Sequence, residues 1–294
     1  EGNGIDIVNQ GQIYVNADGG AEGPAYWVSG IDVWEYGTGK VENYGSIWLA
    51  PPDGHGQAQI ESSGNVLHST GIYAESLGGA LTIVNETDGF IEGGRGTDLA
   101  AGVLVMAWDL GTDAGEGSVT VENKGTITVE FSDAETTAAI LVDSDSSYWP
   151  YDGVGFGEVY IYNRSTGLIA GDGEGQKAIG VHAGEHTHRF IMVVNEGEIR
   201  GDIQLEAENT LVLLKDGSET AGSIWMGDGD SMVVLWGHAD VSGVAVLNGQ
   251  GGNNELWLEA DDEETHDLLE MLDAESLSDK VLNFQAIGIS SGRW

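Results

Sequence analysis

Three histidines and an acid stand close together near residue 185, and these side chains could bind a metal. His182, His186 and His188 lie in the segment Val-His-Ala-Gly-Glu-His-Thr-His, with Glu185 beside them. Imidazole and carboxylate groups are ligands of transition metals, and His186 and His188 would share one face of an extended strand. The spacing matches no zinc signature. A metal site is therefore one hypothesis, and a loop of solvated histidines is the alternative.

A second group of possible metal ligands is acidic. Asp228 and Asp230 lie in Gly-Asp-Gly-Asp, and a Gly/Asn-rich stretch follows at residues 249–254. Tandem Gly/Asp-rich turns can bind calcium through carboxylate and carbonyl oxygens. Here each stretch is single and imperfect, so ordinary turns are the alternative to calcium as a cofactor.

Three aromatic residues stand in a polar stretch, where they cannot all join a core. Tyr148, Trp149 and Tyr151 lie between Ser144 and Gly153. Exposed Trp and Tyr beside Asp suit stacking on sugar rings or anchoring a protein partner. The alternative is a loop folded back onto the body of the protein.

We expect no enzymatic site in this chain. It has no Gly-x-Ser-x-Gly elbow, no His-Glu-x-x-His pair and no Cys nucleophile. Asp230 and Ser231 belong to a Gly-Asp-Ser triplet that also occurs in some secreted serine hydrolases, but no His partner is evident in the sequence. Acid pairs will arise by chance among 49 Asp and Glu residues, while a polysaccharide lyase usually adds basic residues that are scarce here.

The charge of the chain limits its partners. It has 10 Lys plus Arg against 49 Asp plus Glu, giving a formal net charge of −39 over 294 residues. Nucleic acids and anionic membranes are poor partners for such a surface. The absence of Cys suits a protein that crosses an oxidising compartment unfolded, although it is also normal in the cytosol.

A repeated motif predicts the architecture that must position these residues. A segment apolar-x-apolar-x-Asn, followed by Gly-x-Ile, occurs with small variations six times, centred on Asn9, Asn43, Asn85, Asn123, Asn163 and Asn195. Each half alternates with period two, which indicates a short strand with one face inward. Asn and Gly tolerate positive φ and are expected to turn the corner between the strands.

These repeats predict a solenoid, an all-β right-handed parallel β-helix. Another strand-like run lies between successive copies, so we interpret the Asn-to-Asn intervals of 34, 42, 38, 40 and 32 residues as two coils each. About a dozen coils would then form a rod on the order of 60 Å long. Stacked Asn side chains should form a ladder, a feature that favours the solenoid over a β-sandwich.

The chain is expected to be one continuous solenoid with two regions. Residues 1–200 hold the Asn-x-Gly repeats, and residues 201–294 hold more regular coils of about 21 residues, as the spacing of Gly201, Gly222 and Gly243 indicates. Residues 261–277 depart from the coil pattern, because Leu268, Leu269, Leu272 and Leu277 follow helical spacing. We expect a short helix or loop there, packed over the side of the solenoid.

The last quarter of the chain resembles the end of autotransporter passenger domains. The resemblance rests on residues 209–213, 222–224 and 227–235 and on the terminal residues 282–294. It implies a passenger displayed on the surface of a Gram-negative bacterium, secreted through a membrane barrel that lies outside this sequence. It also implies that the C-terminal coils act as the folding core during secretion.

We therefore expect a noncatalytic surface scaffold that acts as an adhesin, an interaction module or a self-associating unit. Its partner would be a glycan or a protein surface, or a second copy of the chain. Two alternatives remain: a β-helix polysaccharide lyase or hydrolase, and a structural surface-layer or filament subunit.

Overall fold

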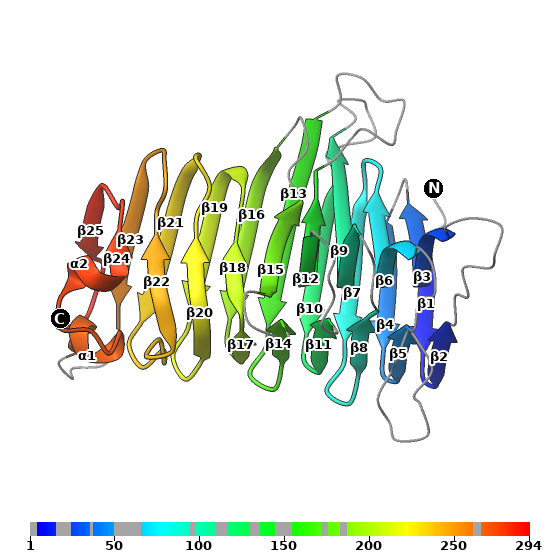
Figure 1. Ribbon diagram of the computed structural model, residues 1–294, viewed down its shortest axis with the longest axis horizontal. Helices are drawn as coiled ribbons and strands as arrows, with labels where there is room; N and C mark the ends of the chain where they lie inside the picture. Colours follow the sequence, from blue (N-terminus) through cyan, green and yellow to red (C-terminus); the bar gives the residue numbers. More distant parts are fainter. Residues whose placement is uncertain are drawn as a thin grey trace.

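The computed structural model is an elongated all-β solenoid in which the chain winds through three parallel sheets, confirming the predicted parallel β-helix (Figure 1). The structure describes residues 5–15, 25–35, 38–49, 66–94, 98–109, 117–129, 136–144, 155–171, 176–182, 187–260 and 266–294. No helix in these ranges has the length and apolarity needed to cross a membrane.

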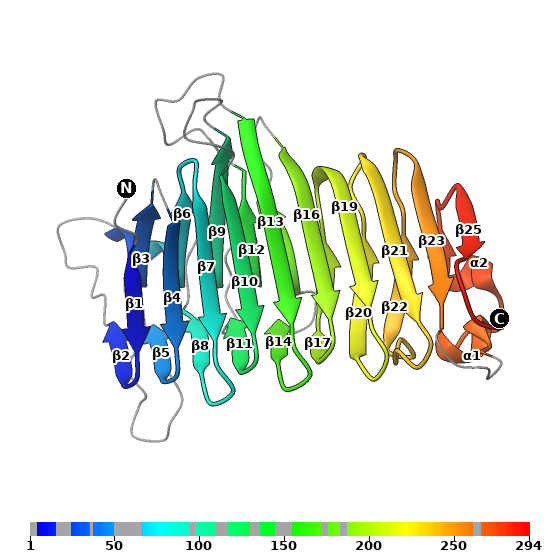
Figure 2. The same cartoon turned by 180° about the vertical axis from the view of Figure 1, so that it is seen from behind.

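Each coil before residue 200 contributes one strand to each of sheets A, B and C, whereas the coils after β20 contribute to sheets A and C only. Sheet A, which faces the viewer in Figure 2, holds β1 (Asp6–Asn9), β4 (Thr38–Asn43), β7 (Ala80–Asn85), β10 (Ser118–Asn123), β13 (Gly155–Asn163), β16 (His188–Asn195), β19 (Ala207–Leu214), β21 (Asp230–Trp236), β23 (Asn254–Glu259) and β25 (Ala286–Ile289). Sheet B holds β2 (Gln12–Val15), β5 (Ser46–Leu49), β8 (Phe90–Gly93), β11 (Thr126–Val129), β14 (Leu168–Gly171), β17 (Glu198–Arg200) and the first part of β20 (Glu219–Trp225). Sheet C holds β3 (Ala25–Glu35), β6 (Val66–Ser76), β9 (Leu99–Asp109), β12 (Thr136–Asp143), β15 (Lys177–His182), β18 (Asp202–Gln204), the second part of β20, β22 (Val244–Asn248) and β24 (Val281–Leu282).

The predicted number of coils was wrong. Asn9 lies opposite Asn43 in the strand pairing of sheet A, and Asn43 lies opposite Asn85, so each Asn-to-Asn interval is one coil and not two. The strand-like run between two motifs is the third side of the same coil. The ten described strands of sheet A leave nine gaps, which at about 4.8 Å each make a rod of about 43 Å.

The core runs along the axis of the solenoid and is built from the inward side of all three sheets. Val121 and Ile127, on the two strands of one repeat, are fully buried, and so is Val103 of sheet C. Isoleucine and valine dominate because branched side chains pack well when identical positions stack on neighbouring strands. The alternating pattern therefore places one apolar row per strand in a dry interior.

The predicted Asn ladder is confirmed. Each Asn side chain donates from Nδ2 to Oδ1 of the Asn on the next coil, at 2.8 to 2.9 Å, from Asn9 through Asn195. The last rung, Asn195, donates to the Thr220 hydroxyl at 3.0 Å. The column satisfies polar groups that the corner would otherwise bury unpaired.

The predicted reason for the Asn-x-Gly corner was wrong. Neither the ladder asparagines nor the glycines that follow them have positive φ. The glycines are needed because coils approach closely there: a Cβ on Gly125 would lie 2.2 Å from the carbonyl oxygen of Gly89, and one on Gly197 would lie 2.3 Å from that of Arg164. Gly is therefore favoured at the corner because a side chain there would collide with the neighbouring coil.

The coils shorten after residue 200 because sheets B and C merge. β20 pairs with β17 in sheet B through its first residues and with β18 in sheet C through its last ones. Gly222 turns the strand between them with φ of +114°, stacked on Gly201 with φ of +112°, values that only glycine adopts readily. One corner loop is lost, and the 21-residue period follows.

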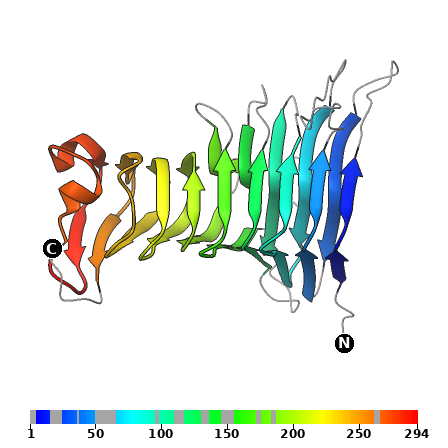
Figure 3. The ribbon, with the colours of Figure 1, turned by 90° about the horizontal axis from the view of Figure 1, so that it is seen from below.

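The predicted insertion is helical, but it covers the end of the solenoid and not its side (Figure 3). It forms α1 (Leu268–Met271), capped by the Asp267 side chain, and α2 (Leu277–Lys280), capped by Ser276. Leu272 is fully buried, and Leu268, Met271, Ala274 and Leu277 pack against the core. The segment shields part of the last coil, whereas Ile287 and Ile289 on β25 stay about half exposed.

Candidate interaction face

The outer side of sheet A carries an unusual run of apolar side chains on its C-terminal half. One row, paired across consecutive strands, is Tyr160, Met192, Leu211 and Met232. The next row is Tyr162, Val194, Leu213, Val234 and Trp257. These nine residues, with Phe190 and Trp236 at the margins, are called face A below. Most of them are partly exposed, and Met232 is the most exposed at 36%.

The polar atoms of two face A aromatics, Tyr160 and Trp257, are held by neighbouring carboxylates. The Tyr160 hydroxyl donates to the Glu158 carboxylate, and Trp257 Nε1 donates to Glu255 at 2.7 Å. The Arg164 guanidinium lies 5.0 Å from the centre of the Tyr162 ring. What these side chains present outward is consequently their apolar surface.

Face A is bordered by ion pairs at the corner where the strands of sheet A end. Arg164 contacts Glu122 at 3.0 Å and Glu196 at 3.6 Å, and Lys215 contacts Glu196 at 2.8 Å. The hydrogen bond from Lys215 is the main reason that the pKa of Glu196 is lowered. The basic residues on this border are thus already paired with carboxylates of the chain itself.

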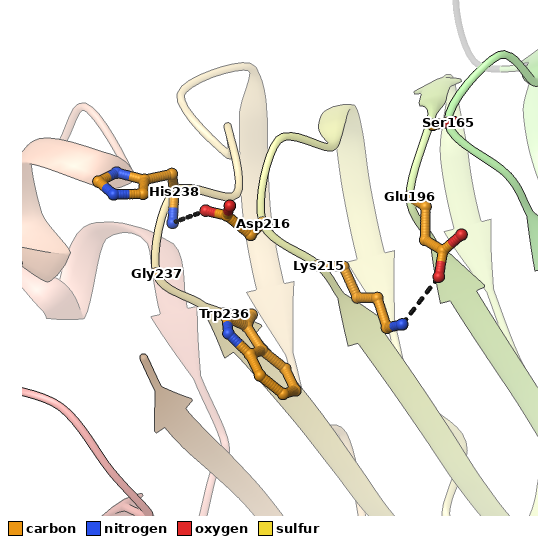
Figure 4. Close-up of a pocket in the computed structure, with 7 residues that line it drawn as sticks. All are labelled: Ser165, Glu196, Lys215, Asp216, Trp236, Gly237 and His238. Carbon is orange, nitrogen blue, oxygen red and sulfur yellow. Dashed lines mark hydrogen bonds and ion pairs between the residues drawn. The ribbon is translucent and has the colours of Figure 1, made fainter. Parts of the chain in front are cut away.

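A hollow of about 590 Å³ opens where this border meets Trp236 (Figure 4). Its lining is Ser165, Glu196, Lys215, Asp216, Trp236, Gly237 and His238. Asp216 Oδ1 accepts from the backbone N–H of His238 at 2.9 Å, which fixes the turn after β21. The hollow extends the apolar rows with an indole ring between charged groups.

A second hollow, of about 420 Å³, lies at the opposite end of the same strands and is lined by Phe190, Leu211, Asp230 and Met232 among others. Asp230, one of the two proposed calcium ligands, sits here with Oδ1 accepting from Asn253 Nδ2 at 3.0 Å. Asp228 is exposed in the turn before β21. Among the residues that the structure describes, no three His, Cys, Asp or Glu side chains lie together as a metal site, and calcium binding stays a prediction.

Two of the three predicted histidines meet at Asp143, through different atoms. His182 Nδ1 lies 3.0 Å from the Asp143 carboxylate, and His188 Nε2 lies 3.0 Å from the Asp143 backbone oxygen. His188 is fully buried, and burial lowers its pKa, favouring the neutral ring. His186 lies outside the described residues, and so do Tyr148, Trp149 and Tyr151.

The outer side of sheet C holds a buried Tyr–Glu pair that the sequence did not reveal. The Tyr73 hydroxyl donates to Glu75 Oε2 at 2.8 Å, and both side chains are at most 2% exposed. Burial raises the pKa of Glu75, and the hydrogen bond from Tyr73 opposes that change only in part. Tyr160 and Glu158 form the same pair on face A, where hydrogen bonds from Tyr160 and Arg189 instead lower the pKa of Glu158.

Replacing Glu75 by Gln is expected to stabilise the protein increasingly as the pH rises. An acid with a raised pKa in the folded state destabilises it above the pKa of the unfolded chain, up to about 1.4 kcal/mol for each pKa unit. Urea unfolding at pH 5.5 and pH 8 should show the larger gain for Glu75→Gln at pH 8.

The matched control is Glu158→Gln, which should act in the opposite direction. An acid with a lowered pKa stabilises the fold above its unfolded pKa, so its removal should destabilise the protein at pH 8. Equal effects of the two variants at both pH values would contradict the assignment.

The sequence does contain a signal for face A. β10, with the sequence Ser-Val-Thr-Val-Glu-Asn, alternates strictly, and its outward positions are polar. From residue 190 the alternation gives way to unbroken apolar runs, Ile-Met-Val-Val, Leu-Val-Leu-Leu and Met-Val-Val-Leu. Such runs are typical of strands that are apolar on both sides.

Comparisons of the chain with models of protein families, with curated proteins and with solved structures find no match.

Proposed function

We propose that this β-helix is a noncatalytic interaction scaffold and that face A is its docking surface. The observation that carries the proposal is the pair of apolar rows, one crossing four consecutive strands and the other five, on a chain of net charge −39. Contiguous apolar patches on the surface of a soluble protein mark interaction sites, and most residues of face A are at least partly exposed.

The scaffold supports this role because the strands that carry face A are already ordered before a partner binds. Each of the strands β13, β16, β19, β21 and β23 is paired with a parallel neighbour on both sides. A preorganised surface loses little conformational entropy on binding. Two hollows at opposite ends of the strands add shape to an otherwise flat face.

We further propose display at the surface of a Gram-negative bacterium as an autotransporter passenger. The parallel β-helix is compatible with this family, and the resemblance over residues 209–213, 227–235 and 282–294 supports it. Protease added to intact cells of the producing bacterium should remove the protein, and protection until the cells are lysed would exclude surface display.

The docking role can be tested with two charge-matched double variants. Leu211→Lys with Met232→Lys alters face A. Thr82→Lys with Thr120→Lys places the same charges in the same row of sheet A, four strands nearer the N-terminus. A glycan array and a panel of immobilised peptides should yield a ligand whose affinity falls at least about tenfold in the first variant only, since each lost apolar contact is worth about 1.5 kcal/mol or more.

The outcome that would refute docking at face A is a ligand that both variants bind equally well. A polysaccharide digestion screen belongs in the same experiment, because release of reducing ends by the unaltered chain would refute the noncatalytic assignment.

A further inference from the structure

We infer, resting on face A as the docking surface, that its partner is a cationic amphipathic helix of about four turns. Three properties of face A lead to this inference: its size, the chemistry of its side chains and the charge around it.

The size of face A suits a slender ligand. Five strands at about 4.8 Å spacing give a width of about 20 Å, and the residues from Asn209 to Lys215 give a length of about 20 Å. The resulting area of about 400 Å² is half of the roughly 800 Å² that each partner of a standard protein interface buries. A helix of 14 residues is about 21 Å long and about 10 Å wide, so it fits within this area.

The chemistry of face A favours an apolar partner over a sugar. Its centre consists of Leu211, Leu213, Met232 and Val234, which offer no hydrogen bonds to hydroxyl groups. The polar atoms of Tyr160 and Trp257 are engaged with Glu158 and Glu255. Leucine and methionine side chains are adaptable and commonly receive the apolar face of a helix.

The charge around face A favours a basic partner. Asp230, Glu255 and Glu259 border face A and form no ion pair with any residue that the structure describes, whereas Arg164 and Lys215 are paired with Glu196. A net charge of −39 also attracts cations at long range. For the same reason a second copy of the chain is a poor occupant, since two copies would repel one another.

The probe for this inference is a synthetic 14-residue helix with Leu on one face and Lys on the other. Two control peptides accompany it: a twin with Glu in place of Lys, and a Leu/Lys peptide of scrambled order that has no apolar face. Fluorescence anisotropy should show that the amphipathic cationic peptide binds at least about tenfold more tightly than either control at 0.15 M salt, where general attraction is screened.

The protein variants locate the binding. Leu211→Lys with Met232→Lys should weaken binding of the peptide at least about tenfold, because apolar contacts are lost. Thr82→Lys with Thr120→Lys should change the affinity by no more than about threefold. Both double variants change the net charge equally, so long-range attraction does not account for the difference. Circular dichroism confirms that each variant retains its β structure. Equal binding of the scrambled peptide, or equal loss in both variants, would overturn the inference.

The same variants separate this inference from the proposed function. The helical probe could fail to bind while the Leu211→Lys and Met232→Lys variant alone loses binding to a glycan. Face A would then remain a docking surface, and the helical partner would be excluded. If no ligand depends on face A, the proposed function falls as well.

Discussion

Asn123→Asp is expected to lower the free energy of unfolding by at least about 3 kcal/mol at neutral pH, although the two side chains have nearly the same shape. Asn123 Nδ2 donates to Asn163 Oδ1 at 2.9 Å and to the Leu168 backbone oxygen at 3.1 Å. A carboxylate would turn both hydrogen bonds into contacts between two acceptors, in a fully buried column. Urea unfolding followed by tryptophan fluorescence measures the loss.

The control lies at the end of the ladder. Among the described residues Asn9 Nδ2 donates only to Asn43, and no described coil lies beyond it. Asn9→Asp should therefore cost about 1 kcal/mol. Lowering the pH should partly restore the stability of the Asn123→Asp variant, because a protonated carboxyl group regains one hydrogen-bond donor. If the two variants unfold at the same urea concentration, the ladder has no special role in stability.

The melting temperature is expected to rise by roughly 5 °C or more between 10 mM and 0.5 M NaCl, because salt screens repulsion among acids that the coils hold close together. Glu198, Glu219 and Asp240 illustrate the cause: they lie opposite one another on consecutive coils, and Arg200 partners only the first. Like charges opposite each other in a sheet destabilise it. The folded chain bears this repulsion, and the expanded chain largely escapes it.

Glu219→Lys tests the local origin of the effect. It places a cation between two acids and should raise the melting temperature at low salt by about 2 °C. Glu275→Lys makes the same charge change at an exposed position of the helical segment and should shift it less. A melting temperature that does not respond to salt would show that the acids are too dispersed to matter.

Calcium at the same ionic strength as NaCl tests the site at Asp228 and Asp230. A much larger stabilisation by calcium, abolished by Asp228→Asn with Asp230→Asn, would establish binding. Equal stabilisation would mean that screening alone accounts for the effect.

Apolar and electrostatic contributions to binding at face A should respond differently to salt. The apolar contacts should keep the ligand bound at high salt, whereas the electrostatic attraction of a basic partner should weaken. A ligand whose affinity vanishes entirely at 0.5 M NaCl would indicate that the acidic surface, and not Leu211 or Met232, provides the binding.

The sequence alone determined the fold class, because two local signals agree at every repeat. Alternation such as Val119 and Val121 around polar neighbours defines a strand with one buried face, and the recurring Asn identifies the position that stacks. The helical segment was also readable, since Leu268, Leu272 and Leu277 follow a different period. These features are local, so no knowledge of distant contacts was needed.

Features that depend on strand register and on the direction of side chains were determined only by the tertiary structure. The pairing of Asn9 with Asn43 shows that the 34-residue interval between them is one coil. The sequence does not show this, because the strand between two motifs could equally have been the first strand of a further coil. Burial of Tyr73 depends on its packing with Leu104 and Leu141 of neighbouring coils, which no local pattern encodes. Face A emerges only when Met192, Leu211 and Met232, about 20 residues apart in the chain, are stacked at the same height on adjacent strands.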